Sequence, residues 1–99
     1  MQANDAQTLV LYALADGPLH GYAVNTAIQE LTGARLGAGS LYGALTRLEA
    51  KGLVEPLDEQ GRQRPVRITD EGRAVLEREL RAMQRVASAG LHRLGVAPA

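Results

Sequence analysis

Residues 39–54 decide the fold, and they read GSLYGALTRLEAKGLV. Four apolar residues recur there at the spacing of one helix face: Leu41, Ala44, Leu45 and Leu48. Ser40 is a preferred N-cap residue. Lys51 places a cation in the last turn of the helix, and Gly52 directly follows that turn. The stretch therefore predicts a helix that is capped by Ser40, ends at Gly52 and leads directly into an apolar strand.

The face of this helix opposite the apolar stripe is small, polar and basic. Four residues point away from the stripe at about 100° per residue: Gly43, Thr46, Arg47 and Ala50. Tyr42 and Glu49 lie on the flank of this face. No bulky side chain obstructs it, so the face can approach another molecule closely.

Two helices are predicted before this stretch. The first is the apolar run 6–15, with Asn4 as the N-cap of a capping box and Gly17-Pro18 after its end. The second runs from residue 21 to Thr32-Gly33 and has one apolar stripe. Residues 34–36 are too few for a helix, and we expect a strand stub there.

A β-hairpin is predicted after it. Residues 53–57 and 62–69 are the two strands, and residues 58–61 are a polar turn. A turn centred on this segment places Pro56 opposite Pro65. A non-hydrogen-bonded pair needs no N–H from either residue, so two prolines are tolerated there.

The last predicted helix carries an apolar seam. Thr69 caps this helix, which runs toward Leu94, and Gly72 near its start permits close approach of the hairpin or of the preceding helix. Apolar residues recur seven apart in two offset rows, and the predicted dimerisation residues are Leu76, Leu80, Met83, Ala87, Leu91 and Leu94. The seam predicts pairing with a second copy of the chain. The alternative is that it folds back on the first helix, and both arrangements can hold in part.

The fold class that follows is mostly α with a two-stranded β-hairpin. Three helices and a hairpin form a winged helix-turn-helix, and a long C-terminal dimerisation helix follows it. We expect a DNA-binding domain over residues 1–69, the dimerisation helix over 70–94 and a disordered tail over 95–99.

Composition excludes several classes of protein. The chain has 99 residues, 45% of them apolar, which is enough for one domain. It has no cysteine, which excludes disulfides and thiol chemistry, and only two histidines, so we expect no metal site and no cofactor. No apolar run approaches the roughly 20 residues of a membrane span. We expect a cytoplasmic protein that is not an enzyme, because no catalytic constellation is present.

The charge is balanced overall and uneven locally. Eleven Lys and Arg residues equal eleven Asp and Glu residues, but residues 35–68 hold six cations against four acids. Lys and Arg contacts release counterions condensed on DNA, so a local basic surface is enough for binding. We expect one continuous basic surface from residue 47 to residue 67. The predicted DNA-binding residues are Tyr22, Ser40, Tyr42, Gly43, Thr46, Arg47, Lys51, Arg62, Arg64 and Arg67.

A second function class stays open. Neutral net charge and the acids Asp58 and Glu59 at the turn favour a winged-helix protein–protein module that binds no nucleic acid. Binding to double-stranded DNA is the preferred prediction. A dimer would place two recognition helices about one helical turn apart and so contact a near-palindromic operator.

Several motifs together resemble those of a known family. They are LHGY at 19–22, GSLY at 39–42, RLE at 47–49, KGLV at 51–54, Arg64 and ITDEG at 68–72. In combination they resemble the PadR family of bacterial transcriptional regulators, in its short subgroup. The resemblance implies a homodimeric repressor whose third helix contacts the operator, with a phenolic, drug-like or other small-molecule effector. It also implies an effector pocket at the dimer interface, between the first and last helices of both chains, for which we predict Leu9, Tyr12 and Ala13.

Overall fold

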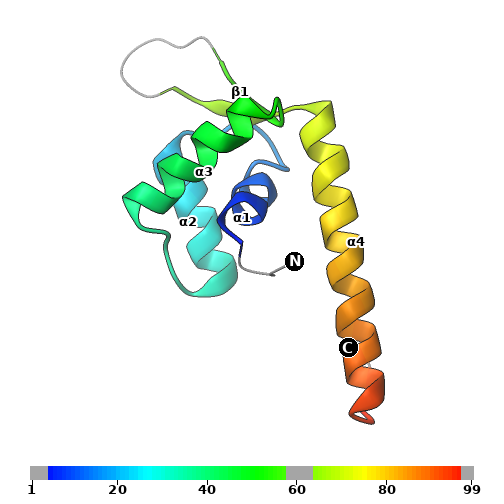
Figure 1. Cartoon of the computed structure of the whole chain (residues 1–99). Coiled ribbons are helices and arrows are strands. Elements are labelled where there is room, and N and C mark those ends of the chain that lie inside the picture. Colours follow the sequence, from blue (N-terminus) through cyan, green and yellow to red (C-terminus); the bar gives the residue numbers. More distant parts are fainter. Residues whose placement is uncertain (1–4, 58–63, 97–99) are drawn as a thin grey trace.

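The computed structural model describes residues 5–57 and 64–96. The elements, in chain order, are α1 (Ala6–Ala13), α2 (Gly21–Thr32), α3 (Ala38–Ala50), β1 (Val54–Pro56), β2 (Val66–Ile68) and α4 (Asp70–Arg93). Figure 1 shows α1 surrounded by the other elements, with the hairpin at one end and α4 along one side. The predicted class, mostly α with a two-stranded hairpin, is confirmed.

The helix α1 is the centre of the core. It packs against α2, α3 and α4, and its apolar run is buried on most sides. Asp5 is its N-cap and accepts a hydrogen bond from the Gln7 amide at 2.9 Å. The predicted cap on Asn4 is therefore wrong by one residue, because the Asp5 carboxylate reaches the amide two residues ahead. The helix ends at Ala13, earlier than predicted, with Leu14 as C-cap.

The connector between α2 and α3 differs from the prediction. Gly33 ends α2 with a φ of +84°, as its position suggested, but residues 34–36 form no strand. They are held instead by the Asn25 side chain, which exchanges two hydrogen bonds of 2.8 Å with the backbone of Leu36. The helix α3 begins at Ala38 with Gly37 as N-cap, so Ser40 lies in its first turn and is not the cap. The Leu41 amide already donates to the Gly37 carbonyl at 2.9 Å, which extends the helix toward the connector.

The hairpin register is set by burial. Val54 pairs with Ile68, and these residues are only 2% and 4% exposed because both face the core. Pro56 consequently lies opposite Val66 and not opposite Pro65, so the predicted pairing is wrong by one residue. Leu19, ahead of α2, forms a bridge with Val66 through two backbone hydrogen bonds of 3.1 and 2.9 Å. The bridge ties the base of the hairpin to the start of α2.

A close approach of backbone determines where α4 begins. Thr69 is its N-cap, accepting from the Gly72 amide at 3.0 Å and donating to the Gly52 carbonyl at 2.8 Å. A Cβ on Gly72 would lie 2.1 Å from the Leu53 carbonyl oxygen, so only glycine fits this contact. The predicted close approach at Gly72 is therefore confirmed.

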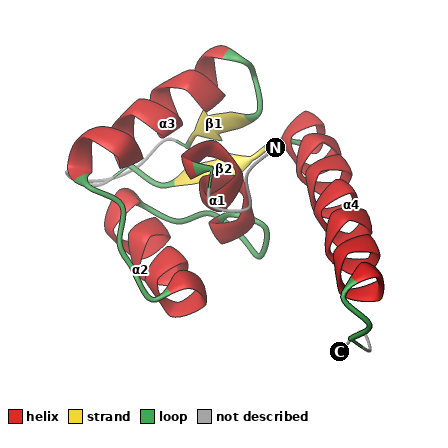
Figure 2. Cartoon of the chain, turned by 60° about the horizontal axis from the view of Figure 1, so that its bottom comes forward, coloured by secondary structure: helices red, strands yellow, loops and turns green. Residues whose placement is uncertain are grey.

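The two halves of α4 have different surroundings. Leu76 belongs to the core cluster, whereas no described residue beyond it on α4 is buried. The helix extends past the body of the molecule, and both views show it on one side (Figures 1 and 2). The whole chain, α4 included, measures 53 × 27 × 21 Å along its principal axes. None of the described helices is long and apolar enough to cross a bilayer. The predicted tail 95–99 lies in part outside the described residues.

Candidate nucleic-acid interface

The outward face of α3 carries the predicted small and basic residues. Ser40, Thr46 and Arg47 are exposed, and Gly43 is half-buried between them. A Cβ on Gly43 would lie 3.4 Å from Nη1 of Arg47, so the guanidinium lies back along this face. The opposite face packs through Leu41, Ala44 and Leu48 into the core. The structure therefore gathers these four residues on one solvent-facing surface.

Tyr42 occupies the flank of α3 that faces the hairpin and the start of α2. Its hydroxyl would lie 2.9 Å from a Cβ on Gly21, so the missing side chain of Gly21 makes room for the ring. A shallow groove of about 220 Å³ runs beside it, lined by Tyr42, Thr46, Glu49, Arg64 and residues of the hairpin base. Tyr42 and Arg64 thus border the α3 face, and the Glu49 carboxylate lies in the same groove.

Lys51, one turn after Arg47, contacts α1. Its Nζ donates to Oε1 of Gln7 on α1 at 2.8 Å, next to a hollow of about 320 Å³ that Asp5 and Glu79 also line. The side chain therefore points toward α1 and α4 from the C-terminal end of α3. Its place among the predicted DNA-binding residues stays a prediction.

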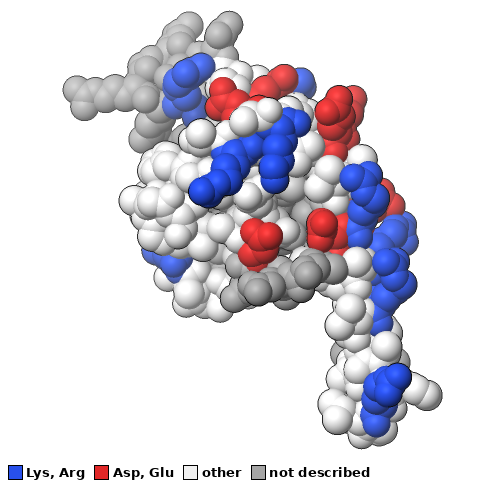
Figure 3. Space-filling view, in the orientation of Figure 1, with Lys and Arg blue, Asp and Glu red and all other residues white. Residues whose placement is uncertain are grey.

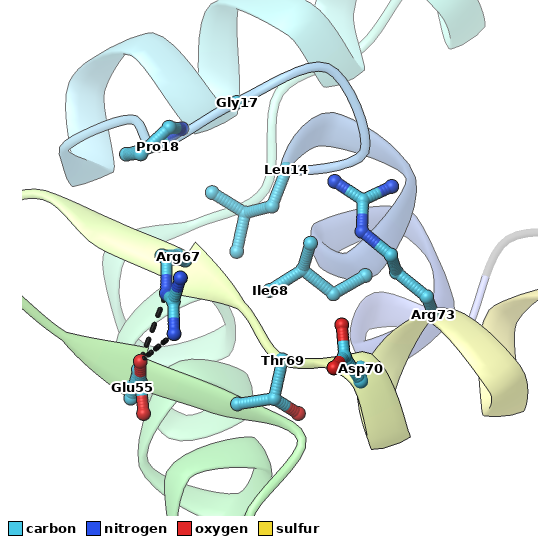
Figure 4. Close-up of a pocket in the computed structure, with 9 residues that line it drawn as sticks. All are labelled: Leu14, Gly17, Pro18, Glu55, Arg67, Ile68, Thr69, Asp70 and Arg73. Atoms are coloured by element: carbon cyan, nitrogen blue, oxygen red, sulfur yellow. Dashed lines mark hydrogen bonds and ion pairs between the residues drawn. The ribbon is translucent and has the colours of Figure 1, made fainter.

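Arg67 also points elsewhere. It forms an ion pair with Glu55 on the neighbouring strand, with 2.8 Å from its Nε to Oε1. Figure 4 shows this pair at a hollow of about 360 Å³ between the α1–α2 loop, the hairpin and the first turn of α4. Arg64 lines the groove on α3, so the hairpin arginines face different hollows. Arg62 lies outside the described residues.

The described cations of the expected basic surface from residue 47 to residue 67 line several different hollows, and because Arg62 lies outside the described residues the continuous surface stays a prediction. Arg47 and Arg64 border α3, whereas Lys51 and Arg67 are directed to separate hollows. The physical reason is that flanking positions on a helix and alternating positions on a strand face different neighbours. Figure 3 shows the face that carries α3, where Lys and Arg side chains lie next to one another in the middle and Asp and Glu side chains lie above, beside and below them.

Tyr22, one of the predicted DNA-binding residues, is exposed. Its side chain is 70% exposed, and the guanidinium carbon of Arg35 lies 4.9 Å from the centre of its ring. Sequence reasoning missed Arg35 as a candidate. The available signal was its isolation, because residues 5–34 hold no other Lys or Arg.

The predicted dimerisation residues divide into two groups. Leu76 is 6% exposed and packs in the core of its own subunit, which agrees with the alternative that the seam folds back. Leu80 and Leu94 are 45% and 77% exposed, Ala87 is exposed, and Met83 and Leu91 are half-buried. A hollow of about 580 Å³ along α4 is lined by Leu80, Met83 and Ala87 between polar residues.

The predicted effector residues lie on α1. Leu9 and Ala13 are buried in the subunit core, and Tyr12 is partly exposed between them in sequence. The effector pocket stays a prediction.

Comparison with known proteins extends these observations. A family model described as the PadR-like transcriptional regulator family matches residues 10–78. A PadR-like transcriptional regulator from Bacillus cereus is 22% identical, with a TM-score of 0.80 over 92% of this chain and 92% of its own. A PadR family transcriptional regulator from Eggerthella lenta is 34% identical, with a TM-score of 0.68 over 88% of this chain and 80% of its own.

A relative in a longer protein is also similar. A 37.1 kDa protein in a transposon of Streptomyces fradiae is 66% identical over 86 residues, which are 87% of this chain and 25% of the relative. The chain thus spans about a quarter of that relative's length. The family match covers the second half of α1, the helices α2 and α3, the hairpin and the start of α4, and so includes the elements that build the α3 surface. The chain therefore belongs to the PadR-like family of transcriptional regulators, whose members are not enzymes.

Proposed function

We propose that the chain binds double-stranded DNA in a sequence-specific manner, as a homodimer, and acts as a repressor. The observation that carries the proposal is the solvent-facing surface of α3, on which Ser40, Thr46 and Arg47 are exposed around Gly43. An α-helix fits the major groove of B-DNA, and small residues let its backbone approach the base edges. This surface contains no acidic residue on its central positions.

Arg47 is the residue that we expect to contribute most to the affinity for DNA. Its guanidinium has five donors and forms bidentate contacts with guanine or a phosphate. Among the described residues it has no carboxylate within 4.0 Å, so it is available for a ligand. Tyr42 and Arg64 border the same surface and supply hydroxyl and guanidinium donors for the DNA backbone. Glu49 opposes close contact with phosphates on that flank.

The exposed seam of α4 supports the homodimer. Leu80, Met83 and Ala87 line a hollow, and Leu94 is exposed further along the same face. An isolated helix has no partner for such a stripe, and a second copy of the same seam buries it symmetrically. Both views place α4 on the side of the body away from α2 (Figures 1 and 2). Pairing through α4 therefore leaves the side that carries α2 free.

DNA binding is tested with a duplex selected from a random library. Affinity is measured by fluorescence anisotropy at several salt concentrations, with a scrambled duplex beside it. We expect a linear fall of log K with log salt and a preference for the selected duplex. Arg47→Ala should lower affinity by about 1–3 kcal/mol on the selected duplex and relax preference at one base pair.

The control variant is Arg85→Ala, since Arg85 is exposed on α4 on the side opposite the seam. It should bind like the wild type. If no duplex is selected at low salt, DNA binding is excluded. Salt-insensitive binding to another protein would then favour the protein–protein module.

Dimerisation is tested by sedimentation equilibrium. The wild type should associate reversibly, and Leu80→Glu should weaken association at least tenfold because a carboxylate enters the seam. Glu77 precedes it by one turn and adds like charge. A wild type that stays monomeric at millimolar concentration would contradict the proposal.

Repression and its relief are tested in a reporter strain. The selected duplex is placed over a promoter, and expression of the chain should lower reporter output. An effector that binds beside Tyr12 should restore it, and Tyr12→Ala should abolish that response without changing DNA affinity. Reporter output that rises on expression of the chain would identify an activator.

A further inference from the structure

An arginine and a tyrosine form a second candidate contact surface on α2. The guanidinium carbon of Arg35 lies 4.9 Å from the centre of the Tyr22 ring, and Nη1 donates to Oε1 of Gln29 at 2.8 Å. Tyr22 and Gln29 are two turns apart on α2, so Arg35 lies along one ridge of that helix. We call these three residues the Arg35 ridge.

The backbone on both sides of Arg35 is anchored to α2. The Thr32 hydroxyl donates to the Ala34 carbonyl at 2.9 Å and accepts from the Ala34 amide at 3.2 Å. The backbone of Leu36 exchanges two hydrogen bonds of 2.8 Å with the side chain of Asn25, which is only 8% exposed. These four contacts determine where the Arg35 side chain starts. A guanidinium that is already ordered loses less entropy when it binds a ligand.

Arg35 forms no ion pair within the described part of the chain. No described carboxylate lies within 4.0 Å of its guanidinium, and the side chain is exposed. One of its five N–H donors reaches Gln29, and the others meet no hydrogen-bond acceptor among the described residues. Stacking on Tyr22 holds the guanidinium plane without consuming those donors. The arrangement matches a receptor for an oxyanion.

The ridge borders the α3 surface. A Cβ on Gly21, next to Tyr22, would lie 2.9 Å from the Tyr42 hydroxyl on α3, and Asn25 holds the connector that leads into α3. Tyr22 follows Gly21 by one residue, which is a rotation of about 100° around α2, and Gln29 follows Asn25 by about one turn. Figures 1 and 2 both place α2 and its connector on the side of the body away from α4. We expect a duplex seated on α3 to reach the Arg35 ridge without meeting α4.

We infer that Arg35, stacked on Tyr22 and held by Gln29, binds a backbone phosphate of the duplex beside the groove that α3 enters. The inference rests on the proposed DNA binding and extends the contact surface to a residue outside α3 and the hairpin. A phosphate contact carries no base information, so it strengthens binding to every sequence alike. Removing one such contact also reduces the salt slope by about 0.9.

The test compares Arg35→Ala with Arg35→Lys, Tyr22→Ala and the control Arg85→Ala. Affinities for the selected and the scrambled duplex are measured from 50 to 300 mM salt. Arg35→Ala should weaken both duplexes by the same factor, about three- to tenfold, and lower the salt slope by about 0.9. Arg35→Lys should keep the slope and lose part of the affinity, because lysine keeps the charge without the stacked plane. Tyr22→Ala should weaken both duplexes while keeping most of the slope.

Thermal melts of each variant show whether the fold is intact, which we expect because Arg35 and Tyr22 are exposed. If Arg35→Ala binds like Arg85→Ala while Arg47→Ala is impaired, the inference is wrong and the proposed DNA binding stands. If Arg35→Ala weakens only the selected duplex, Arg35 contacts a base and the phosphate assignment is wrong. If the wild type binds no duplex, both the proposed function and the inference fail.

Discussion

The two halves of α4 have the same apolar periodicity and different surroundings. In residues 70–79 the helix contacts the core: Leu76 is 6% exposed, and Gly72 touches the Leu53 carbonyl. In residues 80–93 no described side chain is buried, and Leu80, one turn after Leu76, is 45% exposed. One continuous seam therefore meets its own subunit first and solvent afterwards.

This difference shows how a short chain divides one amphipathic helix between two tasks. The first half closes the core that α1, α3 and the hairpin leave open, and the second half offers a surface for a partner. Periodicity reports only that a face is apolar, because it carries no information about which molecule covers that face. The following substitutions test the division, from the largest expected effect to the smallest.

Gly72→Ala should destabilise the fold most, because its new Cβ would meet backbone 2.1 Å away. We expect the free energy of unfolding to fall by about 3 kcal/mol or more, with Tm lower by roughly 15 °C. Urea and thermal unfolding measure both quantities. The matched control is Gly90→Ala in the second half, where nothing lies within 4 Å of the new Cβ. That variant should be at least as stable as the wild type when monomeric.

Leu76→Ala and Leu80→Ala compare the same truncation across the boundary. Leu76→Ala should cost about 2–3 kcal/mol at every protein concentration, since it opens a cavity in the core. Leu80→Ala should cost about 1 kcal/mol in dilute solution, because its side chain is half-exposed there. At high concentration its effect should grow as the dimer forms. Equal losses from the two variants in dilute solution would remove the distinction between the halves.

Thr69→Ala tests how firmly the first half is joined to the hairpin. It removes the acceptor for the Gly72 amide and the donor to the Gly52 carbonyl. The expected loss is about 1 kcal/mol in the free energy of unfolding. Thr69→Ser keeps the hydroxyl and should restore most of it. A serine variant as unstable as the alanine variant would show that the methyl group, not the cap, matters.

Arg81→Gln should have the smallest effect. Its ion pair with Glu77 is 2.8 Å long, but both side chains are about two-thirds exposed, at 66% and 64%. A pair of this kind contributes about 0.3–0.5 kcal/mol, and salt screens it. Chemical unfolding at low and high salt should show a small loss that disappears in 1 M NaCl. A loss above 1 kcal/mol in dilute solution would mean that the second half has a partner within its own subunit.

Much of the fold followed from local signals. Gly33 ends α2, Thr69 caps α4, and the apolar stripe of α3 packs into the core, all as predicted. The errors were displacements of one to three residues, as at the caps of α1 and α3 and in the hairpin register, and one strand, expected at residues 34–36, that does not form. Several local choices there have nearly equal energy, and contacts with other elements select among them.

The candidate site was predictable only where its residues share one element. The α3 face follows from helical geometry alone, so its four residues appear together in the structure. The grouping of basic side chains from neighbouring elements could not be predicted in this way, because the directions of these side chains depend on packing between elements. Lys51 reaches Gln7 on α1 and Arg67 reaches Glu55 on the paired strand, and neither contact has a sequence signal. Arg35 was missed for the same reason.

The amino-acid sequence by itself determined the order of the helices and hairpin, the outward face of α3 and the continuous seam of α4. These features depend on periodicity and caps, which act within a few residues of each other. Only the tertiary structure decided which basic side chains share a surface, that Arg35 stacks on Tyr22, and where the seam passes from core to solvent. Those outcomes depend on the angles at which elements pack, and many distant side chains set those angles together.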